Sequence, residues 1–140
     1  MSKNEWRRVR GSEDDVLERY YDAAKLGEAD TIVRITSDCP LVDSELIDQC
    51  IKKFMKDPRV DCVGNSLPPR SFPRGLDVEV LSCAALELAW HEDQNPAWRE
   101  HVPPYIYRHP EIFQIRTVKS DLDFAWMRWC MDTVEDLILV

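Results

Sequence analysis

The sequence lacks any apolar run near the roughly 20 residues that a membrane-spanning helix requires. The segment from Met1 to Arg10 is polar and has no apolar signal-peptide core. With only four glycines, the chain has no glycine-rich dinucleotide fingerprint, and it shows neither a zinc-ligand spacing nor a Ser/His/Asp order. These absences predict a cytoplasmic protein without membrane insertion, and they exclude the commonest recognisable enzyme motifs.

Cysteine is present but is not arranged for a disulfide framework or a metal. The number of cysteines is odd and no C-x-x-C pair occurs. This pattern is typical of reduced thiols that serve as small core residues. The five cysteines are Cys39, Cys50, Cys62, Cys83 and Cys130.

Length and charge limit both the architecture and the partners. The chain has 140 residues, 44% of them hydrophobic, so we expect a single domain over 1–140 with a polar lead-in over 1–9. The formal net charge of -8 argues against a nucleic acid polymer or an anionic membrane as partner. A single nucleotide stays compatible with this charge, because one bound metal ion reverses the local field.

Helical and strand patterns alternate along the chain. Helices are predicted after the caps Ser12, Asp43 and Ser82, within 102–108, and from Thr133 onward, whereas 95–99 is predicted to be a loop. Strands are predicted over 31–36, 60–63, 76–81, 112–118 and 128–131. This alternation predicts an α/β fold, Rossmann-like, with a mostly parallel sheet and helices on both faces.

Two acidic turns follow predicted strands. Asp38 lies in Thr-Ser-Asp-Cys-Pro after an apolar strand, and Asp132 lies in Met-Asp-Thr-Val-Glu-Asp. Ligands bind outside the carboxyl ends of strands in open α/β sheets, and magnesium is commonly held by one or two carboxylates with phosphate oxygens. Spacing alone favours the simpler alternative, in which each aspartate bonds nearby backbone amides.

A second block, Phe-Pro-Arg-Gly-Leu-Asp-Val-Glu-Val over 72–80, combines charge with a backbone-permissive residue. Arg74 can bind an anion bidentately, and Gly75 suits a positive φ or a close backbone approach. Asp77 and Glu79 alternate with valines, so both project from one face, where they can accept sugar hydroxyls. The alternative is a half-exposed strand with a solvated face.

A third block, Arg-Glu-His-Val over 99–102, precedes two prolines. His101 can act as an acid–base group or contact a sugar, although a histidine at a helix start more often caps or packs.

Taken together and in order, these motifs resemble the spore coat polysaccharide biosynthesis protein F family. The resemblance begins near Val9 and is carried by the blocks at 10–20, 33–43, 72–80, 99–110 and 132–137. The family consists of cytidylyltransferases that activate sugars as CMP derivatives. It implies a nucleotide-diphospho-sugar transferase fold, with CTP or CMP and a sugar or sugar acid as partners and Mg²⁺ as cofactor.

The resemblance also implies roles for individual residues. Asp38 and Asp132 would be the catalytic metal-binding carboxylates, and Gly11 and Ser12 would lie near the base or ribose. The residues that would line the sugar pocket are Arg74, Asp77, Glu79, Glu100 and His101. The reaction would transfer a cytidylyl group from CTP, release pyrophosphate, and serve cell-surface polysaccharide biosynthesis.

One family feature has no counterpart ahead of Gly11: a loop of the type Gly-Ser-x-Arg-x-Pro-Gly-Lys that wraps the triphosphate. We therefore expect a partial, truncated domain with bare strand edges, covered in a homodimer or larger assembly. Whether this chain is itself an enzyme stays open. The alternatives are a catalytically inactive binding or assembly module and a glycosyltransferase of related fold.

Overall fold

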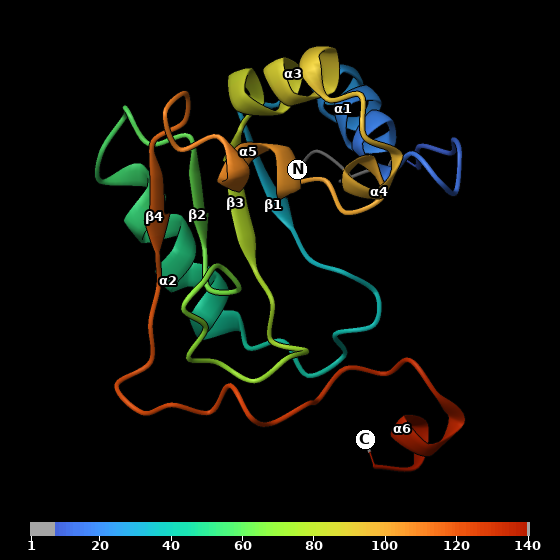
Figure 1. Cartoon of the computed structure of the whole chain (residues 1–140), viewed down its shortest axis with the longest axis vertical. Coiled ribbons are helices and arrows are strands. Elements are labelled where there is room, and N and C mark those ends of the chain that lie inside the picture. The colour runs from blue at the N-terminus through green and yellow to red at the C-terminus, as the bar shows by residue number, and fades with distance from the viewer. Residues whose placement is uncertain (1–7, 140) are drawn as a thin grey trace, which may run out of the picture.

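The computed structural model describes residues 8–139, which form one four-stranded sheet and six helices (Figure 1). In chain order the helices are α1 (Val16–Leu26), α2 (Ser44–Met55), α3 (Cys83–Glu92), α4 (Pro96–Arg99), α5 (Pro104–Arg108) and α6 (Val134–Leu139). The strands are β1 (Thr31–Arg34), β2 (Cys62–Gly64), β3 (Glu79–Ser82) and β4 (Ile115–Thr117).

The sheet has the strand order β1-β3-β2-β4, with β3 antiparallel to both of its neighbours and β2 parallel to β4. Strands β1, β2 and β4 therefore point the same way, but two of the three pairings are antiparallel. The α/β class is confirmed, whereas the expectation of mostly parallel pairing is wrong. No helix separates β2 from β3, and the loop 65–78 brings the chain back to the end of the sheet where β2 ends, so β3 runs antiparallel beside β2.

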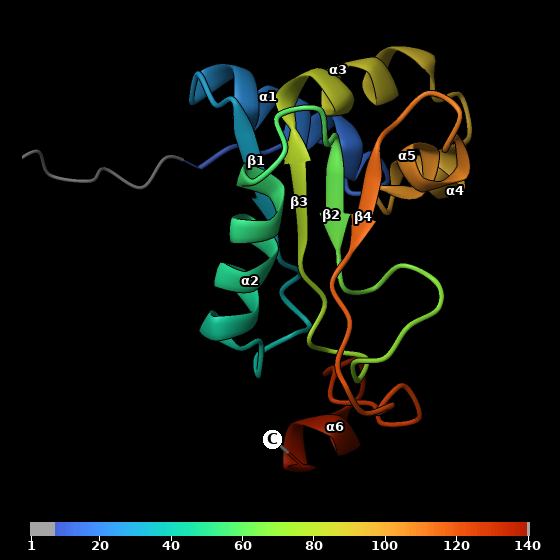
Figure 2. The same ribbon diagram turned by 90° about the vertical axis from the view of Figure 1, so that its left-hand side faces the viewer.

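Helices cover both faces of the sheet, as expected. Cys62 and Leu81, which are directly opposite in the β2–β3 register, pack with α1, α3 and α5. Their neighbours Val63 and Val80 face the other way and pack with α2. Figure 2 shows α2 on one face of the sheet. Because side chains alternate along a strand, the sheet supports two cores, and burial of each such aliphatic side chain stabilises the fold by about 1.5–3 kcal/mol.

The helix caps agree with the sequence at Asp43, Ser82 and Thr133 and differ at Ser12. The Asp43 carboxylate accepts a hydrogen bond from the Glu45 amide, and the Ser82 hydroxyl accepts one from the Ala85 amide. Ser12 was expected to cap the first helix, but the cap is Asp15. Ser12 instead accepts amide hydrogen bonds from the turn before the helix, at 3.2 and 3.3 Å.

Two predicted segments were wrong for physical reasons. Residues 95–99 form the short helix α4, because the Asn95 side chain accepts from the Ala97 amide and Pro96 occupies the first turn. Residues 128–131 are not a strand. Arg128 makes a single isolated bridge with Arg74, since this segment lies beside a loop and not beside a strand.

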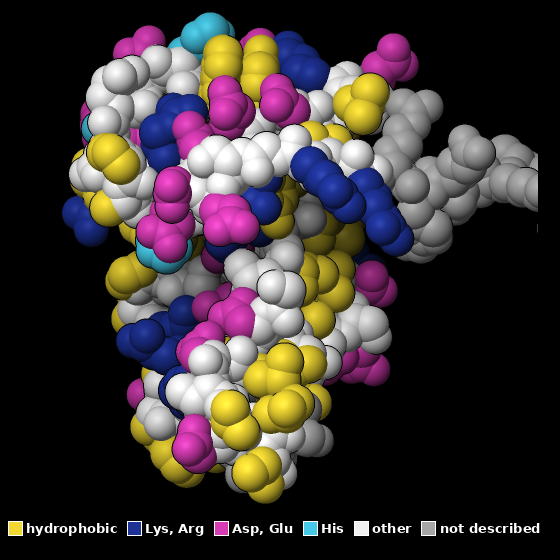
Figure 3. All heavy atoms as spheres, turned by 90° about the vertical axis from the view of Figure 1, so that its right-hand side faces the viewer, with side chains coloured by type: hydrophobic (Ala, Val, Ile, Leu, Met, Phe, Trp, Pro, Cys, Tyr) yellow, Lys and Arg dark blue, Asp and Glu magenta, His cyan; other side chains and the backbone are white. Residues whose placement is uncertain are grey.

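Residues 119–139, here named the C-terminal arm, run past the end of the sheet and finish in α6 (Figure 1). Hydrogen bonds attach the arm to the loop before β3, from the Phe124 amide to the Ser71 carbonyl and from the Arg74 amide to the Met127 carbonyl. Hydrophobic side chains gather at this end of the molecule (Figure 3). The large exposed ones on the arm are Leu122, Trp126, Trp129, Val134, Leu137 and Ile138.

Between residues 8 and 139, none of the helices has the length and apolar character needed to traverse a bilayer.

Candidate functional site

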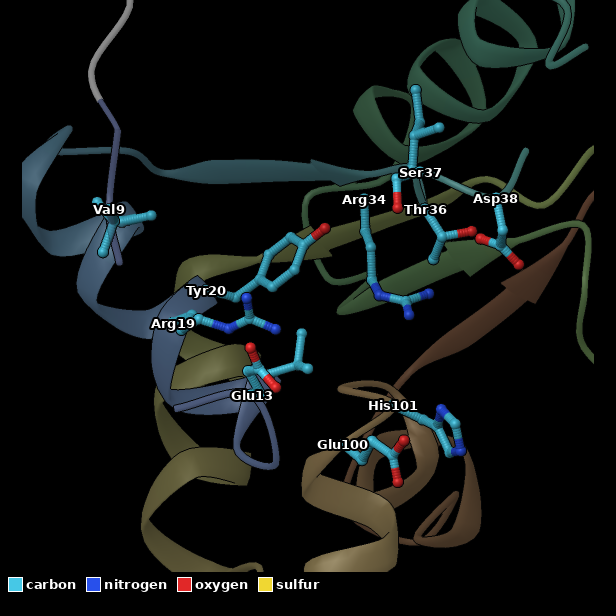
Figure 4. Close-up of a pocket in the computed structure, with 13 residues that line it drawn as sticks. Val9, Glu13, Arg19, Tyr20, Arg34, Thr36, Ser37, Asp38, Glu100 and His101 are labelled. Atoms are coloured by element: carbon cyan, nitrogen blue, oxygen red, sulfur yellow. The ribbon is translucent and has the colours of Figure 1, made fainter. Parts of the chain in front are cut away.

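Two adjoining clefts open beside the sheet. The first cleft, of about 690 Å³, is lined from α1, from the segment after β1, and by Glu100 and His101 (Figure 4). The second cleft, of about 640 Å³, is lined by the loops that follow β1 and precede β3 and by α5. Arg34, Thr36, Asp38 and His101 line both clefts, so the two form one continuous candidate site.

The second cleft lies where β1 and β2 end and β3 begins. Its walls come from the turn 36–39, the loop 66–77, the arm residues 130 and 132, and the start of α5. A site at the carboxyl ends of strands was expected from the sequence. The cleft gathers six of the predicted site residues: Asp38, Arg74, Asp77, Glu79, His101 and Asp132.

The two acidic turns, which are far apart in the sequence, are joined directly in the structure. The Met131 amide donates to the Asp38 carbonyl at 2.8 Å, so Asp132 follows immediately after the contact. The Asp38 turn is fixed by the Cys39 amide, which donates to the Thr36 carbonyl at 3.2 Å. Asp38 is half-buried and Asp132 is exposed, and both carboxylates line the second cleft.

Asp132 has a cationic neighbour. Arg128 donates to its carboxylate at 2.7 Å, and this hydrogen bond is the main reason that the pKa of Asp132 lies below its ordinary value. Asp132 is therefore ionised at neutral pH. Two carboxylates facing one cleft suit a hard cation that takes its other ligands from phosphate and water. Across residues 8–139, no group of three or more His, Cys, Asp or Glu side chains is placed to hold a metal.

Asp77 and Glu79, the acids of the 72–80 block, both line the second cleft, but each carboxylate already forms an ion pair with an arginine. Asp77 forms a two-pronged ion pair with Arg70, at 2.5 and 3.0 Å. Glu79 forms a buried ion pair with Arg34 at 2.8 Å. Gly75 has φ of 101°, and a side chain there would collide with the backbone between Trp129 and Cys130. The close approach expected at Gly75 is thus to the C-terminal arm.

The remaining predicted residues divide between the first cleft and the surface. Glu100 and His101 line the first cleft, and the next residue, Val102, is buried with φ of 67°, which is unusual for a β-branched residue. Gly11 and Ser12 line neither cleft. Their assignment to the nucleotide stays a prediction.

Most of the arginines that surround the second cleft were not predicted from the sequence. Arg34, Arg70 and Arg108 all line it, with Arg74. Arg34 could have been noticed in the sequence, because it is a charged residue inside the apolar strand pattern of 31–36. Arg70 and Arg108 carried no such signal, because only the folding of a proline-rich loop and of α5 brings them to the cleft.

Known proteins resemble this chain over nearly its whole length. The family model for cytidylyltransferases matches residues 4–137. An uncharacterised protein of Methanocaldococcus jannaschii is 39% identical over 132 residues, covering 93% of this chain and 52% of that protein. The spore coat polysaccharide biosynthesis protein SpsF of Bacillus subtilis is 29% identical over 138 residues, covering 96% and 55% respectively. The chain thus spans about half the length of the curated relatives it matches.

Solved structures also resemble this chain. A cytidylyltransferase from Leptospira borgpetersenii superposes with a TM-score of 0.86 at 36% identity, over 91% of this chain and 54% of that one. CMP:2-keto-3-deoxy-manno-octonic acid synthetase complexed with CTP superposes with a TM-score of 0.55 at 12% identity, over 79% and 60%. The second likeness shows the fold alone. With its fold, its ordered motifs and a family match across residues 4–137, this chain belongs to the cytidylyltransferase family.

Proposed function

We propose that this chain takes part in transfer of a cytidylyl group from CTP to a sugar or sugar acid, with release of pyrophosphate. One observation carries the proposal: Asp38 and Asp132 face one cleft and are joined through the Met131–Asp38 backbone hydrogen bond. Arginines surround the same cleft, and guanidinium groups bind phosphate oxygens bidentately. Carboxylates for a cation and arginines for phosphates are the two needs of nucleotidyl transfer.

In this proposal Asp38 and Asp132 are the residues that would hold Mg²⁺. The ion, when bound, supplies charge neutralisation on the phosphate oxygens. Arg128 orients the Asp132 carboxylate and keeps it ionised. The arginines of the second cleft hold the departing phosphates in place, so that the sugar hydroxyl attacks in line with the leaving group.

The sugar side of the proposal rests on Arg74, Glu100 and His101, because Arg70 already pairs with both carboxylate oxygens of Asp77. His101 lines both clefts and is exposed, so it can reach a ligand that spans them. Glu79 faces the second cleft too, but Arg34 and Ser66 already occupy its carboxylate. By analogy with the role named for SpsF, we propose that the activated sugar enters polysaccharide biosynthesis.

Calorimetry of CTP binding, with and without MgCl₂, tests the proposed function. Asp38→Asn and Asp132→Asn should each weaken magnesium-dependent binding about 10- to 100-fold, the loss expected for a charged contact. Asp48→Asn is the matched control, because Asp48 is an exposed aspartate on α2 that lines neither cleft. Binding that is unchanged in both site variants would remove the basis of the proposal.

A second candidate function, a self-assembly module, is favoured by the exposed apolar side chains of the C-terminal arm. Ile138 is 83% exposed and Trp126 is 77% exposed, and such patches commonly mark interaction sites. We propose that a homodimer or larger assembly covers them. Light scattering coupled to gel filtration should give at least twice the monomer mass, and Trp126→Ser with Ile138→Ser should lower it. A monomer at all concentrations contradicts this candidate.

A further inference from the structure

Arg34 occupies an unusual position for a charged residue. It is the last residue of β1 and is only 9% exposed, yet it lines both clefts. In Figure 4 its side chain points into the first cleft, between Tyr20 on one side and Thr36 and Asp38 on the other. A buried guanidinium at the junction of two clefts requires partners, because burial of an unpaired charge is costly.

One partner is Glu79, and the sheet itself places it there. Arg34 and Glu79 are directly opposite in the antiparallel β1–β3 register. The Arg34 Nη1 donates to Glu79 Oε2 at 2.8 Å, while the Ser66 hydroxyl donates to Glu79 Oε1 at 2.7 Å. Both carboxylate oxygens are therefore occupied. Glu79, at 5% exposure, is an anchor for Arg34 and not a free acceptor of sugar hydroxyls.

The remaining donors of Arg34 are not all satisfied by the protein. Its Nε is buried and has no hydrogen-bond partner among the described residues. Arg19 lines the first cleft from α1, and its Nε is also buried without a hydrogen-bond partner among the described residues. Buried donors are almost always paired in folded proteins, so two unpaired guanidinium N–H groups at one cleft indicate an absent acceptor. A guanidinium fork suits the oxygens of a phosphate, and Asp38 beside it is the proposed cation ligand.

We propose that Glu79 is a positioning residue that holds Arg34 as a phosphate-binding cation at the junction of the two clefts. This deepens the proposed function and rests on it for the location of the phosphate. The antiparallel register fixes the arginine on the rigid sheet, so little side-chain entropy is lost when a phosphate binds. Arg70 and Arg74 of the second cleft lie on the loop before β3, so no strand pairing fixes them.

Titration of the full chain with sodium pyrophosphate, without metal, tests this inference. Arg34→Lys should weaken pyrophosphate binding about 10-fold, since the fork is lost while the charge remains. Glu79→Gln should weaken it by a similar factor, although Glu79 does not touch the ligand. In nuclear magnetic resonance spectra, the Arg34 Nε–Hε signal should shift on pyrophosphate addition in the wild type, and less in Glu79→Gln.

Loss of one partner of a buried ion pair can impair folding, so two further variants are needed. Arg34→Met combined with Glu79→Leu replaces the pair with apolar side chains, which commonly preserves stability. We expect it to fold and to bind pyrophosphate about 10- to 100-fold more weakly. Arg99→Met is the matched control, because it breaks the half-buried Arg99–Asp15 ion pair outside both clefts. It should leave pyrophosphate binding unchanged.

The outcomes separate this inference from the proposed function. If the folded double variant binds pyrophosphate like the wild type, or if the wild type does not bind it, the inference is overturned. If only Arg34 variants lose binding and Glu79→Gln does not, the positioning role of Glu79 is wrong. If pyrophosphate binds as expected but magnesium-dependent CTP binding is absent, the proposed function fails while the phosphate site stands.

Discussion

The two carboxylates of the candidate site are chemically identical but are supported in different ways. Asp38 lies four residues after the end of β1, and the next residue, Cys39, is buried against the folded body at 5% exposure. Asp132 lies on the C-terminal arm, where large apolar side chains are exposed and support comes from local hydrogen bonds. Arg128 pairs with Asp132 and with Asp136, and Asp136 also accepts from the Asp132 and Thr133 amides.

This difference shows how one site can combine a rigid half with an adaptable half. The position of Asp38 depends on a turn that the Cys39–Thr36 hydrogen bond closes and that packs on the folded body through the buried Cys39. The position of Asp132 depends on contacts of the arm that can open locally at lower cost. In the proposed function, this arrangement would let the second carboxylate adjust to a bound cation while the first stays in place.

The largest expected effect is a loss of stability when the packed core behind the sheet is altered. Leu81→Ala removes a fully buried side chain from β3 and should lower the free energy of unfolding by about 2–5 kcal/mol, measured by urea denaturation. Ile138→Ala on the arm should change it by no more than about 0.5 kcal/mol, because Ile138 is exposed. Equal effects from the two variants would mean that the arm belongs to the same cooperative unit as the core.

The contact between the two regions should give the next largest effect. Gly75→Ala places a β-carbon at φ of 101° against the backbone of Trp129 and Cys130. The backbone strain costs about 1–3 kcal/mol, and the collision should displace the arm and speed amide hydrogen exchange at Met131. Urea denaturation measures the free energy of unfolding, and hydrogen exchange measures the exposure of the Met131 amide.

Gly27→Ala provides the control for that change. Gly27 ends α1 with φ of -87°, and a β-carbon there would lie 3.2 Å from the Ala23 carbonyl oxygen. It should lower the free energy of unfolding by less than about 1 kcal/mol and leave exchange at Met131 unchanged. Faster exchange in both variants would show that the arm does not depend on the close approach at Gly75.

The smallest expected effect is on the hydrogen-exchange protection of α6, and it depends on pH. A hydrogen bond from Arg128 holds the pKa of the Asp136 carboxyl well below its ordinary value, and the Asp132 and Thr133 amides add to this. Because the folded pKa is depressed, the stabilisation is complete above the unfolded value near 3.9 and is lost as the pH falls through the folded value. Hydrogen-exchange protection of α6 should therefore decrease in acid.

Asp136→Asn is the matched variant for the pH experiment. It removes the titrating group, so protection of α6 should be low at neutral pH and nearly independent of pH in acid. The helix α2 in the same sample serves as an internal reference, since Asp136 makes no hydrogen bond with it. The same acid-dependent loss in Asp136→Asn would assign the effect to another carboxyl group.

Much of the local structure was predictable because its causes are local. Asp43 and Ser82 cap helices through their own side chains, and Thr133 with Asp136 forms the expected reciprocal cap of α6. The first helix shows the limit of this reasoning, since Ser12 and Asp15 are both good caps. The choice between them depends on Arg99, which donates to Asp15 from α4 at 2.7 Å.

The candidate site was predictable in its acids and less so in its cations. Asp38 follows an apolar strand, a pattern that indicates the edge of a sheet, whereas residues 128–131 are not a strand and the C-terminal arm brings Asp132 to the cleft. Arg34 and Arg70 were not predicted as site residues, because the sequence does not show in which direction the side chain of an arginine on a strand or a loop points. Only the β1–β3 register puts Arg34 opposite Glu79, and only the folded loop brings Arg70 to Asp77.

The sequence by itself determined the α/β class, most helix boundaries, the family and the two acidic turns, since each depends on residue order or on contacts within a few positions. The tertiary structure alone decided that β3 runs against its neighbours and that Gly75 packs against the C-terminal arm. It also decided that Glu79 binds Arg34. These features depend on contacts between distant segments, whose geometry is fixed only when both cores are packed.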